Sequence, residues 1–407
     1  MTTALANKRL LLGVTGGIAA YKAAELCRLL IKGGADVHVV MTSAATRFVA
    51  PLTFETLSGH PVGTELFALG PGQSIQHTEL GRHVDAVVVA PATADFLGKL
   101  AHGLADDLLT NVLLASHVPV LLCPAMNVEM WDNPLVQQNL ERLVVLPRFT
   151  VLTPDVGWLA CNVDGRGRLP EAERIVRHVD RLFLPRDLTG RRLLVTAGPT
   201  REWVDPVRFI SNPSSGRMGL ALAEAAWARG AEVTLIHGPL AIAPPPEVAA
   251  TLIDTTAELH HAVLAALPGT DALIMAAAPA DWRPMTPSAE KRPKTAVGSL
   301  LTLEPTIDVL ASVTHHAARP RVVVGFAAES HDVLARSMEK ARRKRVDLLF
   351  GNVVERDGVD TGFGAPTNAG FLVDGDGALL RAVPLGPKAA VAHAILDAVV
   401  ARLGAAP

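Results

Sequence analysis

This sequence of 407 residues has few cysteines, little net charge and no long apolar segment, and each shortage excludes a class of protein. Its three cysteines, Cys27, Cys123 and Cys161, are too few for a disulfide framework, which indicates a reducing compartment and predicts a cytoplasmic protein. A formal net charge of −2 gives no reason to expect a nucleic acid or an anionic membrane as partner. No apolar segment reaches the roughly 20 residues that a membrane-spanning helix needs.

The N-terminal segment has only part of the pattern of a signal peptide. Lys8-Arg9 precedes the apolar run Leu10–Ala20, but Gly16-Gly17 interrupts this run. Tyr21-Lys22 then continues into a helical pattern where a cleavage site would be expected. We therefore predict that this segment belongs to the folded protein.

The length of the chain exceeds what one ordinary core supports, so two domains of about 200 residues are expected. The segment Pro185–Gly190 is the best boundary, because a new alternation of strands and helices starts directly after it. We predict a first domain over residues 1–187 and a second over residues 188–407.

Both halves alternate strand-like and helical segments. The strand-like runs of the first half are Arg9–Val14, Asp36–Met41, Ala86–Ala90 and Val118–Cys123, and its helical patterns are Ile18–Lys32, Ala94–His102, Asp106–Ala115 and Glu171–Leu184. The strand-like runs of the second half are Leu193–Ala197, Val233–Ile236, Asp271–Ala276, Arg321–Phe326 and Asp347–Phe350. Continuous apolar strands between helices predict parallel sheets covered on both faces, and thus an α/β fold of two doubly wound, Rossmann-like domains.

The end of the second half differs from this alternation. Gly370–Asp374 and Leu379–Val383 flank Gly375-Asp376-Gly377, which is typical of a β-hairpin. The second sheet is therefore predicted to be mixed. Residues 285–298 are polar and contain Pro287 and Pro293, which predicts a mobile loop.

Two turns with glycine and small residues suit an anion. Gly13–Ala19 follows the first strand, and Ser211–Gly219 precedes the apolar helix Leu220–Arg229, so each presents backbone N–H groups at a helix start. Neither half combines Gly-x-Gly-x-x-Gly with an acidic residue at the end of the second strand, which disfavours a nicotinamide dinucleotide. In the first half that strand ends in Met41-Thr42-Ser43, whose hydroxyls suit a phosphate. Mononucleotide sites are favoured, with ordinary tight turns as the alternative.

Three side chains of the first half are candidates for chemistry. His77 precedes a helical pattern, and Asn127 follows a predicted buried strand, where ligands of open α/β sheets gather. Cys161 lies in a loop rich in glycine and arginine, which suits a reactive thiol. A solvated, idle histidine is the alternative for His77. Cys27 and Cys123 indicate packing, and no spacing of cysteine and histidine predicts a metal site.

Four motifs of the first half occur in the order found in the flavin-containing cysteine decarboxylases, which the first 185 or so residues resemble. They are Gly13–Lys22, Ser74–His77, Pro124–Asn127 and the loop around Cys161. The resemblance implies a flavodoxin-like domain that binds FMN. It implies FMN contacts at Gly16, Gly17, Ile18, Ser43, Thr93, Ala94, Asp95 and Phe96.

The resemblance also implies roles for the three candidates. His77 would act in oxidation and decarboxylation of the cysteinyl substrate, Asn127 would bind its carboxylate, and Cys161 would donate a proton to the enethiol that results. Transient oxidation by the flavin supplies the electron sink that decarboxylation needs. The family usually has glycine after the cysteine, where this chain has Asn162, the residue that best replaces glycine at positive φ. We expect an active unit, with an inert FMN-binding unit of regulatory or scaffold role as the alternative.

The second half carries a second ordered set of motifs and resembles the phosphopantothenate–cysteine ligases. The set consists of Thr196–Glu202, Asp205–Arg208, Ser211–Gly219, Ala280–Pro284, Glu290-Lys291, Gly325–Glu329, Phe363-Gly364 and Asn368. The whole chain thus resembles the bifunctional phosphopantothenoylcysteine decarboxylase/phosphopantothenate–cysteine ligase family of coenzyme A biosynthesis. This implies that 4′-phosphopantothenate reacts with CTP to an acyl-cytidylate, that L-cysteine displaces CMP, and that the phosphopantothenoylcysteine is decarboxylated to 4′-phosphopantetheine.

Site residues of the second half follow from the same resemblance. Asn212 would hold the acyl intermediate, and Lys291 would neutralise charge on the transferring phosphoryl group. The implied CTP contacts are Met275, Ala276, Ala277, Asp281, Lys291, Ile307, Asp308, Val309, Leu310, Phe326, Lys340 and Lys344. Mg²⁺ would bridge the phosphates, with ligands that remain unidentified. The alternative for most of Glu339–Arg345 is a solvated basic helix face, and for Lys291 a surface lysine.

Two departures from the ligase pattern are visible. Arg292-Pro293 interrupts the second basic pair that usually follows Lys291, and Asn352-Val353-Val354 replaces the usual Asn-Asp pair, which leaves CTP or ATP as the nucleotide open. The family implies homo-oligomers, with a trimeric flavin domain and a dimeric ligase domain whose sites are completed across subunits.

Overall fold

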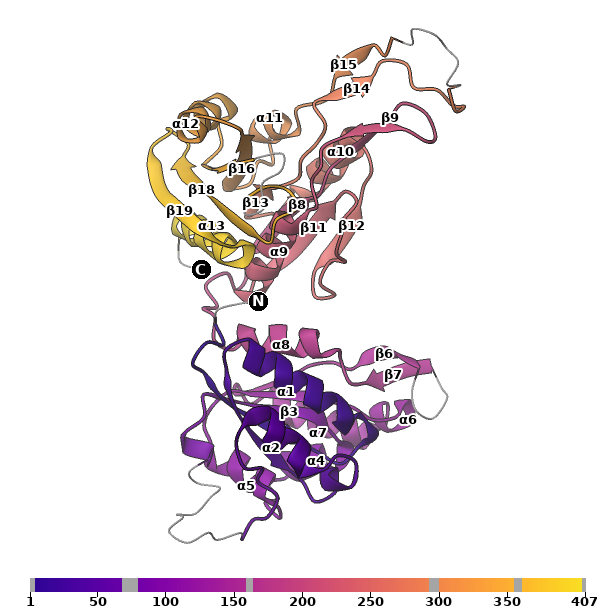
Figure 1. Cartoon of the computed structure of the whole chain (residues 1–407), viewed down its shortest axis with the longest axis vertical. Helices are drawn as coiled ribbons and strands as arrows, with labels where there is room; N and C mark the ends of the chain where they lie inside the picture. The colour runs from indigo at the N-terminus through magenta and orange to yellow at the C-terminus, as the bar shows by residue number, and fades with distance from the viewer. Residues whose placement is uncertain (1–3, 68–79, 159–163, 293–299, 355–360, 405–407) are drawn as a thin grey trace. The chain divides into compact units, whose positions relative to one another are not determined.

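The computed structural model describes residues 4–67, 80–158, 164–292, 300–354 and 361–404. The chain divides into two compact units, Thr2–Leu184 and Pro185–Pro407, and each has its own sheet and core (Figure 1). The division falls a few residues before the boundary expected at residue 187. Because each unit is self-contained, each is described by itself.

The first unit is built on a five-stranded sheet with the order β2-β1-β3-β4-β5, the flavodoxin-like order. The strands are β1 (Arg9–Val14), β2 (Asp36–Met41), β3 (Ala86–Ala92), β4 (Val120–Pro124) and β5 (Phe149–Val151). All neighbouring strands are parallel. All seven residues of β3 are buried, as expected for a central strand covered on both faces.

Helices cover both faces of this sheet. They are η1 (Ile18–Tyr21), α1 (Lys22–Lys32), η2 (Ala45–Arg47), α2 (Pro51–Ser58), α4 (Ala94–Ala101), α5 (Leu108–Ala115), α6 (Val128–Trp131), α7 (Pro134–Val144) and α8 (Ala172–Arg181). One apolar core joins α1, α2 and α8 to one face of the sheet. A second core joins α4, α5 and α7 to the other face. A short antiparallel hairpin of β6 (Asp155–Trp158) and β7 (Asp164–Arg168) stands apart from the sheet.

The second unit is built on an eight-stranded sheet with the order β12-β11-β8-β13-β16-β17-β18-β19. The strands are β8 (Arg192–Ala197), β11 (Glu232–His237), β12 (Ala249–Leu252), β13 (Ala272–Met275), β16 (Val322–Glu329), β17 (Leu348–Val353), β18 (Thr367–Asp374) and β19 (Leu379–Pro387). The strands from β12 to β17 are parallel. Since β18 and β19 pair antiparallel, the predicted hairpin and the mixed sheet are confirmed.

The helices of the second unit also cover both faces of its sheet. They are α9 (Arg217–Ala228), α10 (Thr256–Ala266), α11 (Val309–Thr314), α12 (Val333–Lys344) and α13 (Lys388–Leu403). Helices α10, α11 and α12 share one apolar core with the sheet, and α9 packs against α13. The predicted α/β class with two doubly wound domains is thus confirmed. None of the described helices is long and apolar enough to cross a membrane.

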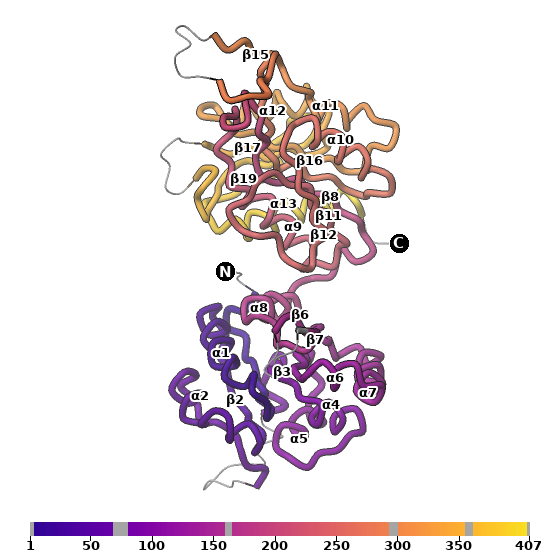
Figure 2. Tube along the Cα trace, turned by 90° about the vertical axis from the view of Figure 1, so that its right-hand side faces the viewer, coloured from indigo at the N-terminus to yellow at the C-terminus, as the bar shows by residue number. Residues whose placement is uncertain are grey.

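Two short antiparallel pairs of the second unit lie outside its sheet, and we call them together the arm. One pair is β9 (Arg201–Trp203) with β10 (Phe209–Ser211), and the other is β14 (Trp282–Pro284) with β15 (Leu303–Pro305). The two pairs touch where β14 packs beside β9, and β14 and β15 extend away from the sheet (Figure 1 and Figure 2). Part of the loop expected at residues 285–298 lies in 293–299, outside the described residues.

Candidate functional site

A cleft of about 1010 Å³ opens at the carboxyl ends of the strands of the first unit, where open parallel sheets bind ligands. Three turns form most of its wall. They bring together the residues predicted to bind FMN, namely Gly16, Gly17, Ile18, Ser43, Thr93, Ala94, Asp95 and Phe96, and the predicted substrate residue Asn127. The cleft has the size of a cofactor site.

A buried hydroxyl joins two of these turns. The Oγ1 of Thr15 donates to the carbonyl of Pro91 at 2.7 Å and accepts from the backbone amide of Thr93 at 3.0 Å. The turns after β1 and β2 also approach closely, because a Cβ on Gly16 would lie 2.3 Å from the Cβ of Ala44. A side chain at residue 16 would therefore push these turns apart.

The start of η1 makes one end of this cleft suitable for a phosphate. Gly17 is extended, and η1 begins at Ile18, so the first amides of the helix have no acceptor within it. The hydroxyls of Thr42 and Ser43 line the same cleft. Free amides and hydroxyls around an open space form an anion cradle, so these residues fit the phosphate of a flavin mononucleotide.

Asn127, which also lines this cleft, is held in place by its own helix. Its Oδ1 accepts from the backbone amide of Met130 at 2.8 Å and so caps α6. With the oxygen used in this way, the NH₂ group is the donor that Asn127 can offer to a carboxylate.

The hairpin β6–β7 packs against the residues that precede α6. The backbone amide of Met126 donates to the carbonyl of Gly167 at 3.0 Å, and a Cβ on Gly167 would lie 2.1 Å from the carbonyl oxygen of Met126. Trp158, at the end of β6, also lines the cleft. Cys161 and Asn162 lie between the two strands, and His77 lies in 68–79; all three are outside the described residues.

Lys99 is a cation that lines this cleft and that no sequence motif indicated. Its Nζ lies 3.0 Å from Asp106 and 3.3 Å from Asp95. Hydrogen bonding to Asp106, followed by the influence of Asp95, raises the pKa of Lys99 although burial opposes this. The ammonium group is thus fixed in its charged form, with the i, i+4 spacing from Asp95 as the only signal in the sequence.

The second unit has a cleft of about 970 Å³ at the carboxyl ends of its parallel strands. Asn212 lines it, together with every predicted nucleotide residue except Lys291; these are Met275, Ala276, Ala277, Asp281, Ile307, Asp308, Val309, Leu310, Phe326, Lys340 and Lys344. The turn Ser214–Gly219 lines the same cleft, apart from Ser215. The helix α9 starts at Arg217, inside the predicted turn and three residues before the predicted start.

The segment after β13 is held in place by hydrogen bonds from neighbouring elements. The Nδ2 of Asn212 donates to the carbonyls of Pro279 at 2.9 Å and Ala278 at 3.3 Å. The backbone amide of Ala280 donates to the buried hydroxyl of Thr200 at 2.9 Å. Asn212 thus sits where its amide is already engaged with the wall that the nucleotide residues form.

Two lysines of α12 face this cleft, whereas their charged neighbours do not. Lys340 and Lys344 are half-buried, and Glu339, Arg342 and Arg343 are exposed. Burial lowers the pKa of Lys340, and the nearby carboxylates of Glu329 and Asp281 only partly offset this effect. A solvated face therefore describes the other charges of this helix.

Lys344 makes an ion pair with Asp308, which caps α11 through the backbone amide of Ala311 at 3.0 Å. Burial acts to raise the pKa of Asp308, but the ammonium of Lys344 and the amide of Ala311 lower it overall. This pair links α12 to the start of α11 at the edge of the cleft.

Lys291 lies apart from this group. It is exposed on the connection between β14 and β15, and it is not among the described residues that line the cleft. The next residue is anchored, because the backbone amide of Arg292 donates to Asp205 at 3.2 Å and its carbonyl accepts from Arg208 at 2.9 Å. The structure therefore fixes the base of the connection and leaves Lys291 exposed.

A buried lysine at the start of α13 was not predicted. The Nζ of Lys388 donates to the carbonyl of Gly362 at 3.1 Å and to that of Ala365, and the residue lines the cleft. Burial, with a smaller effect of Arg217, lowers the pKa of Lys388 to about 8. No local pattern marks it, because its partners come from distant parts of the chain.

Comparison with known proteins gives a consistent match over the whole chain. Residues 1–184 match the family model described as "Flavoprotein", and residues 188–403 match "DNA/pantothenate metabolism flavoprotein C-terminal domain". The chain is 41% identical over 401 residues to "Coenzyme A biosynthesis bifunctional protein CoaBC" of Bacillus subtilis, covering 98% of both chains. It is 44% identical over 412 residues to the protein of the same description from Mycobacterium tuberculosis, covering 97% of both. A crystal structure of the C-terminal domain of such a protein is 33% identical, with a TM-score of 0.45, and covers 54% of this chain and 98% of that one.

Proposed function

The chain belongs to the family of coenzyme A biosynthesis bifunctional proteins, and we propose that its two clefts carry out two consecutive steps. The second unit joins L-cysteine to 4′-phosphopantothenate with CTP. The first unit decarboxylates the resulting phosphopantothenoylcysteine to 4′-phosphopantetheine. The observation that carries this proposal is that each unit gathers its own set of candidate residues around a separate cleft at the carboxyl ends of its strands.

The ligase reaction has two halves. A carboxylate oxygen of 4′-phosphopantothenate attacks the α-phosphorus of CTP, which forms an acyl-cytidylate and releases pyrophosphate. The amine of cysteine then attacks the acyl carbon, which forms the amide and releases CMP, and the amine loses a proton. Phosphoryl transfer of this kind depends on positioning and on cations that offset developing charge. The cleft supplies such cations in Lys340 and Lys344, and Arg217 stands at its rim.

We assign the two halves to different residues. Lys291 neutralises charge on the transferring phosphoryl group when the arm brings it to the nucleotide. Asn212 holds the acyl group. Its side chain is fixed in the wall of the cleft, since its Nδ2 donates to the carbonyls of Ala278 and Pro279. Mg²⁺, if bound, would offset the charge of the nucleotide's phosphates, as triphosphate sites commonly require. Asn352 and Val354 line the cleft, so the departure at Asn352-Val353-Val354 bears on the choice between CTP and ATP.

In the first unit, FMN would lie with its phosphate at Gly16, Gly17 and Ile18 and near the hydroxyl of Ser43. Bound there, it supplies the two-electron oxidation that makes the cysteinyl carboxylate a leaving group. Asn127 donates its NH₂ group to that carboxylate. His77 acts in the first half of the reaction, which comprises oxidation and decarboxylation. Cys161 donates a proton to the enethiol in the second half, in which the enethiol is reduced.

We also propose that both units self-associate, as trimers of the first and dimers of the second, in a cytoplasmic enzyme. Apolar side chains support this, because Ile18, Tyr21 and Trp158 beside the flavin cleft are 61%, 61% and 67% exposed. Phe209 and Trp282 are 42% and 51% exposed on the arm. Clustered apolar exposure of this kind marks interaction surfaces. Light scattering of the purified full chain tests the proposal, and a monomer would contradict it.

One incubation tests the whole sequence of reactions. The full chain is mixed with 4′-phosphopantothenate, L-cysteine, CTP and Mg²⁺, and products are followed by mass spectrometry. We expect 4′-phosphopantetheine together with CMP and pyrophosphate. Phosphopantothenoylcysteine that accumulates without 4′-phosphopantetheine would favour an inert first unit and direct attention to Asn162. No CMP from CTP, and no AMP when ATP replaces it, would reject the ligase assignment. Omission of Mg²⁺ and replacement of CTP by ATP test the two finer assignments.

A further inference from the structure

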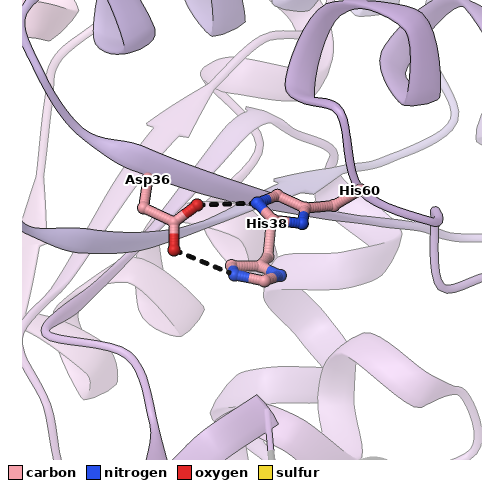
Figure 3. A group of neighbouring side chains, drawn as sticks. All are labelled: Asp36, His38 and His60. Atoms are coloured by element: carbon pink, nitrogen blue, oxygen red, sulfur yellow. Dashed lines mark hydrogen bonds and ion pairs between the residues drawn. The ribbon is translucent and has the colours of Figure 1, made fainter.

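A group of three metal-binding side chains lies in the first unit, away from the turns that form the flavin cleft. Asp36 is the first residue of β2, and His38 stands two residues further on, so both side chains project from the same face of the strand. His60 follows Gly59, whose left-handed backbone (φ 73°) ends α2 and turns the chain back. Figure 3 shows both imidazole rings directed toward the carboxylate of Asp36.

The distances within this group are short. The Nε2 of His60 lies 2.7 Å from Oδ1 of Asp36, and the Nε2 of His38 lies 3.5 Å from Oδ2. The two rings are stacked with their centroids 4.2 Å apart, and the three ligand atoms lie within 4.8 Å of one another. The side chains of Asp36, His38 and His60 are 42%, 28% and 35% exposed, so an ion has access from solvent.

We propose that Asp36, His38 and His60 form a binding site for a divalent transition metal of the Zn²⁺ type, distinct from both clefts. Two imidazole nitrogens and one carboxylate oxygen are the donor set that Zn²⁺, Co²⁺ and Ni²⁺ accept, and three protein ligands leave a position for water. Zn–N bonds of about 2.0–2.1 Å place tetrahedral ligand atoms about 3.3 Å apart. The Nε2 of His38 is near that spacing from Oδ2 of Asp36, whereas the Nε2 of His60 is closer, at 2.7 Å from Oδ1. An ion therefore requires the His60–Asp36 hydrogen bond to open and the two rings to move apart.

A metal at this group would have to compete with a cation of the protein for the carboxylate of Asp36. The competing cation is Arg9, whose Nε lies 3.7 Å from Asp36. Its side chain is 56% exposed and can turn into solvent when an ion enters.

The ion would add a polar link between two elements, α2 and β2, that already share an apolar core. β2 is an edge strand, and its Val40 makes an isolated bridge with Gly63. The turn before this bridge is braced by the amide of His60, which donates to the hydroxyl of Ser58 at 3.2 Å. A metal bound by His60 and the strand clamps the end of α2 onto β2. The first unit should therefore melt at a temperature that rises with free Zn²⁺.

The test is a Zn²⁺ titration of the flavin-loaded full chain. Bound metal is first removed with a chelator, and Zn²⁺ is then added in the presence of a chromophoric chelator that competes for it. We expect the wild type to bind one more Zn²⁺ per chain than His38→Asn/His60→Asn, so metals at other residues cancel in the difference. Co²⁺ should give d–d absorption that the double variant lacks. His83→Asn, which changes an exposed histidine of the same unit, is the matched control and should bind as the wild type does. Equal stoichiometry in the wild type and the double variant would overturn the proposal.

A variant that is expected to bind Zn²⁺ more tightly serves as a further test, because misfolding cannot produce tighter binding. Arg9→Gln removes the competing cation but keeps the backbone hydrogen bond to Asp85, and it should bind Zn²⁺ roughly tenfold more tightly. Asp36→Asn should weaken binding by tenfold or more, because it removes the charged ligand. Retained flavin and an unchanged melting temperature in chelator show that each variant is folded. Weaker binding by Arg9→Gln, or no Zn²⁺-dependent melting in the wild type, would reject the site.

Discussion

Asp205 accepts a hydrogen bond from the backbone amide of Arg292 at 3.2 Å and thereby fixes the base of the connection that carries Lys291. The carboxylate is buried and also receives the guanidinium of Arg208, which, with the backbone amides of Val207, Arg292 and Arg208, holds the pKa of Asp205 well below its usual range. Asp205 is therefore ionised at any pH at which the enzyme works.

The first prediction concerns this anchor. Asp205→Asn weakens the charge-assisted hydrogen bonds to Arg208 and Arg292, so Lys291 is held less well and formation of the acyl-cytidylate should slow by roughly tenfold to a hundredfold. Pyrophosphate release without cysteine measures this half-reaction. Decarboxylation of supplied phosphopantothenoylcysteine is the control and should not change.

The role of Asp205 can be separated from a general structural one. If it acts through Lys291, then Asp205→Asn should have little further effect in a Lys291→Gln background. Equal slowing in both backgrounds would show that Asp205 does not position Lys291.

The second prediction concerns the amide of Asn212. Asn212→Asp places a carboxylate opposite the carbonyls of Ala278 and Pro279, which now accept from Nδ2. We expect pyrophosphate release to continue while amide formation falls by tenfold or more, so that acyl-cytidylate accumulates or is hydrolysed. Rapid quench with mass spectrometry detects it. A variant that forms the amide at the wild-type rate would remove Asn212 from the second half-reaction.

The third prediction concerns the pH dependence of stability. Because the pKa of Lys388 falls from 10.5 to about 8 on folding, the folded chain binds fewer protons than the unfolded chain between these values. Its contribution to stability thus rises with pH across this window, by no more than about 3 kcal/mol, and is constant below pH 8. The neutral amine keeps two N–H groups for the carbonyls of Gly362 and Ala365.

Urea unfolding of the wild type and of Lys388→Met at neutral and alkaline pH measures this effect. The free energy of unfolding of the wild type, minus that of the variant, should increase as pH rises from about 8 to 10.5. If this difference stays constant or decreases, folding does not lower the pKa of Lys388.

The fourth prediction separates the two units by chemistry. Cys161→Ser removes the proposed proton donor and leaves the residues of the phosphate cradle, Gly16 and Gly17, and those of the second unit unchanged. We expect flavin absorbance and CMP formation to be retained while 4′-phosphopantetheine formation falls by a hundredfold or more. Undiminished formation of 4′-phosphopantetheine would exclude Cys161 from the mechanism.

The sheets could be predicted because their strands are marked by local pattern. β1 and β2 were predicted at their observed ends, since each is a continuous apolar run bounded by a turn. The hairpin of β18 and β19 was indicated by Gly375-Asp376-Gly377. In contrast, the pairs β6–β7, β9–β10 and β14–β15 were not predicted, because strands of three to five residues gain stability from partners that no local pattern reveals.

The same contrast applies to the sites. The positions around the two clefts lie in or near turns that sequence motifs identify, and the structure gathers them around the clefts. Their roles stay predictions. Lys388 was missed because Gly362 and Arg217 come from separate elements. The group of Asp36, His38 and His60 was missed because the prediction of metal sites used the sequence spacing of cysteines and histidines. His60 is 22 residues beyond His38 and comes close to it only because α2 turns the chain back toward β2. Side-chain environments that depend on tertiary contacts escape any reading of local pattern.

The position of Lys388 has a consequence for how the enzyme is made. The wall of the ligase cleft includes Lys388, the first residue of α13, so this cleft is complete only after the ribosome has released the chain beyond residue 388. The sheet and cores of the first unit lie within Thr2–Leu184, so this unit can fold while the remainder is being translated. Synthesis therefore finishes the decarboxylase before the ligase, which is the reverse of the order in which the substrate meets them.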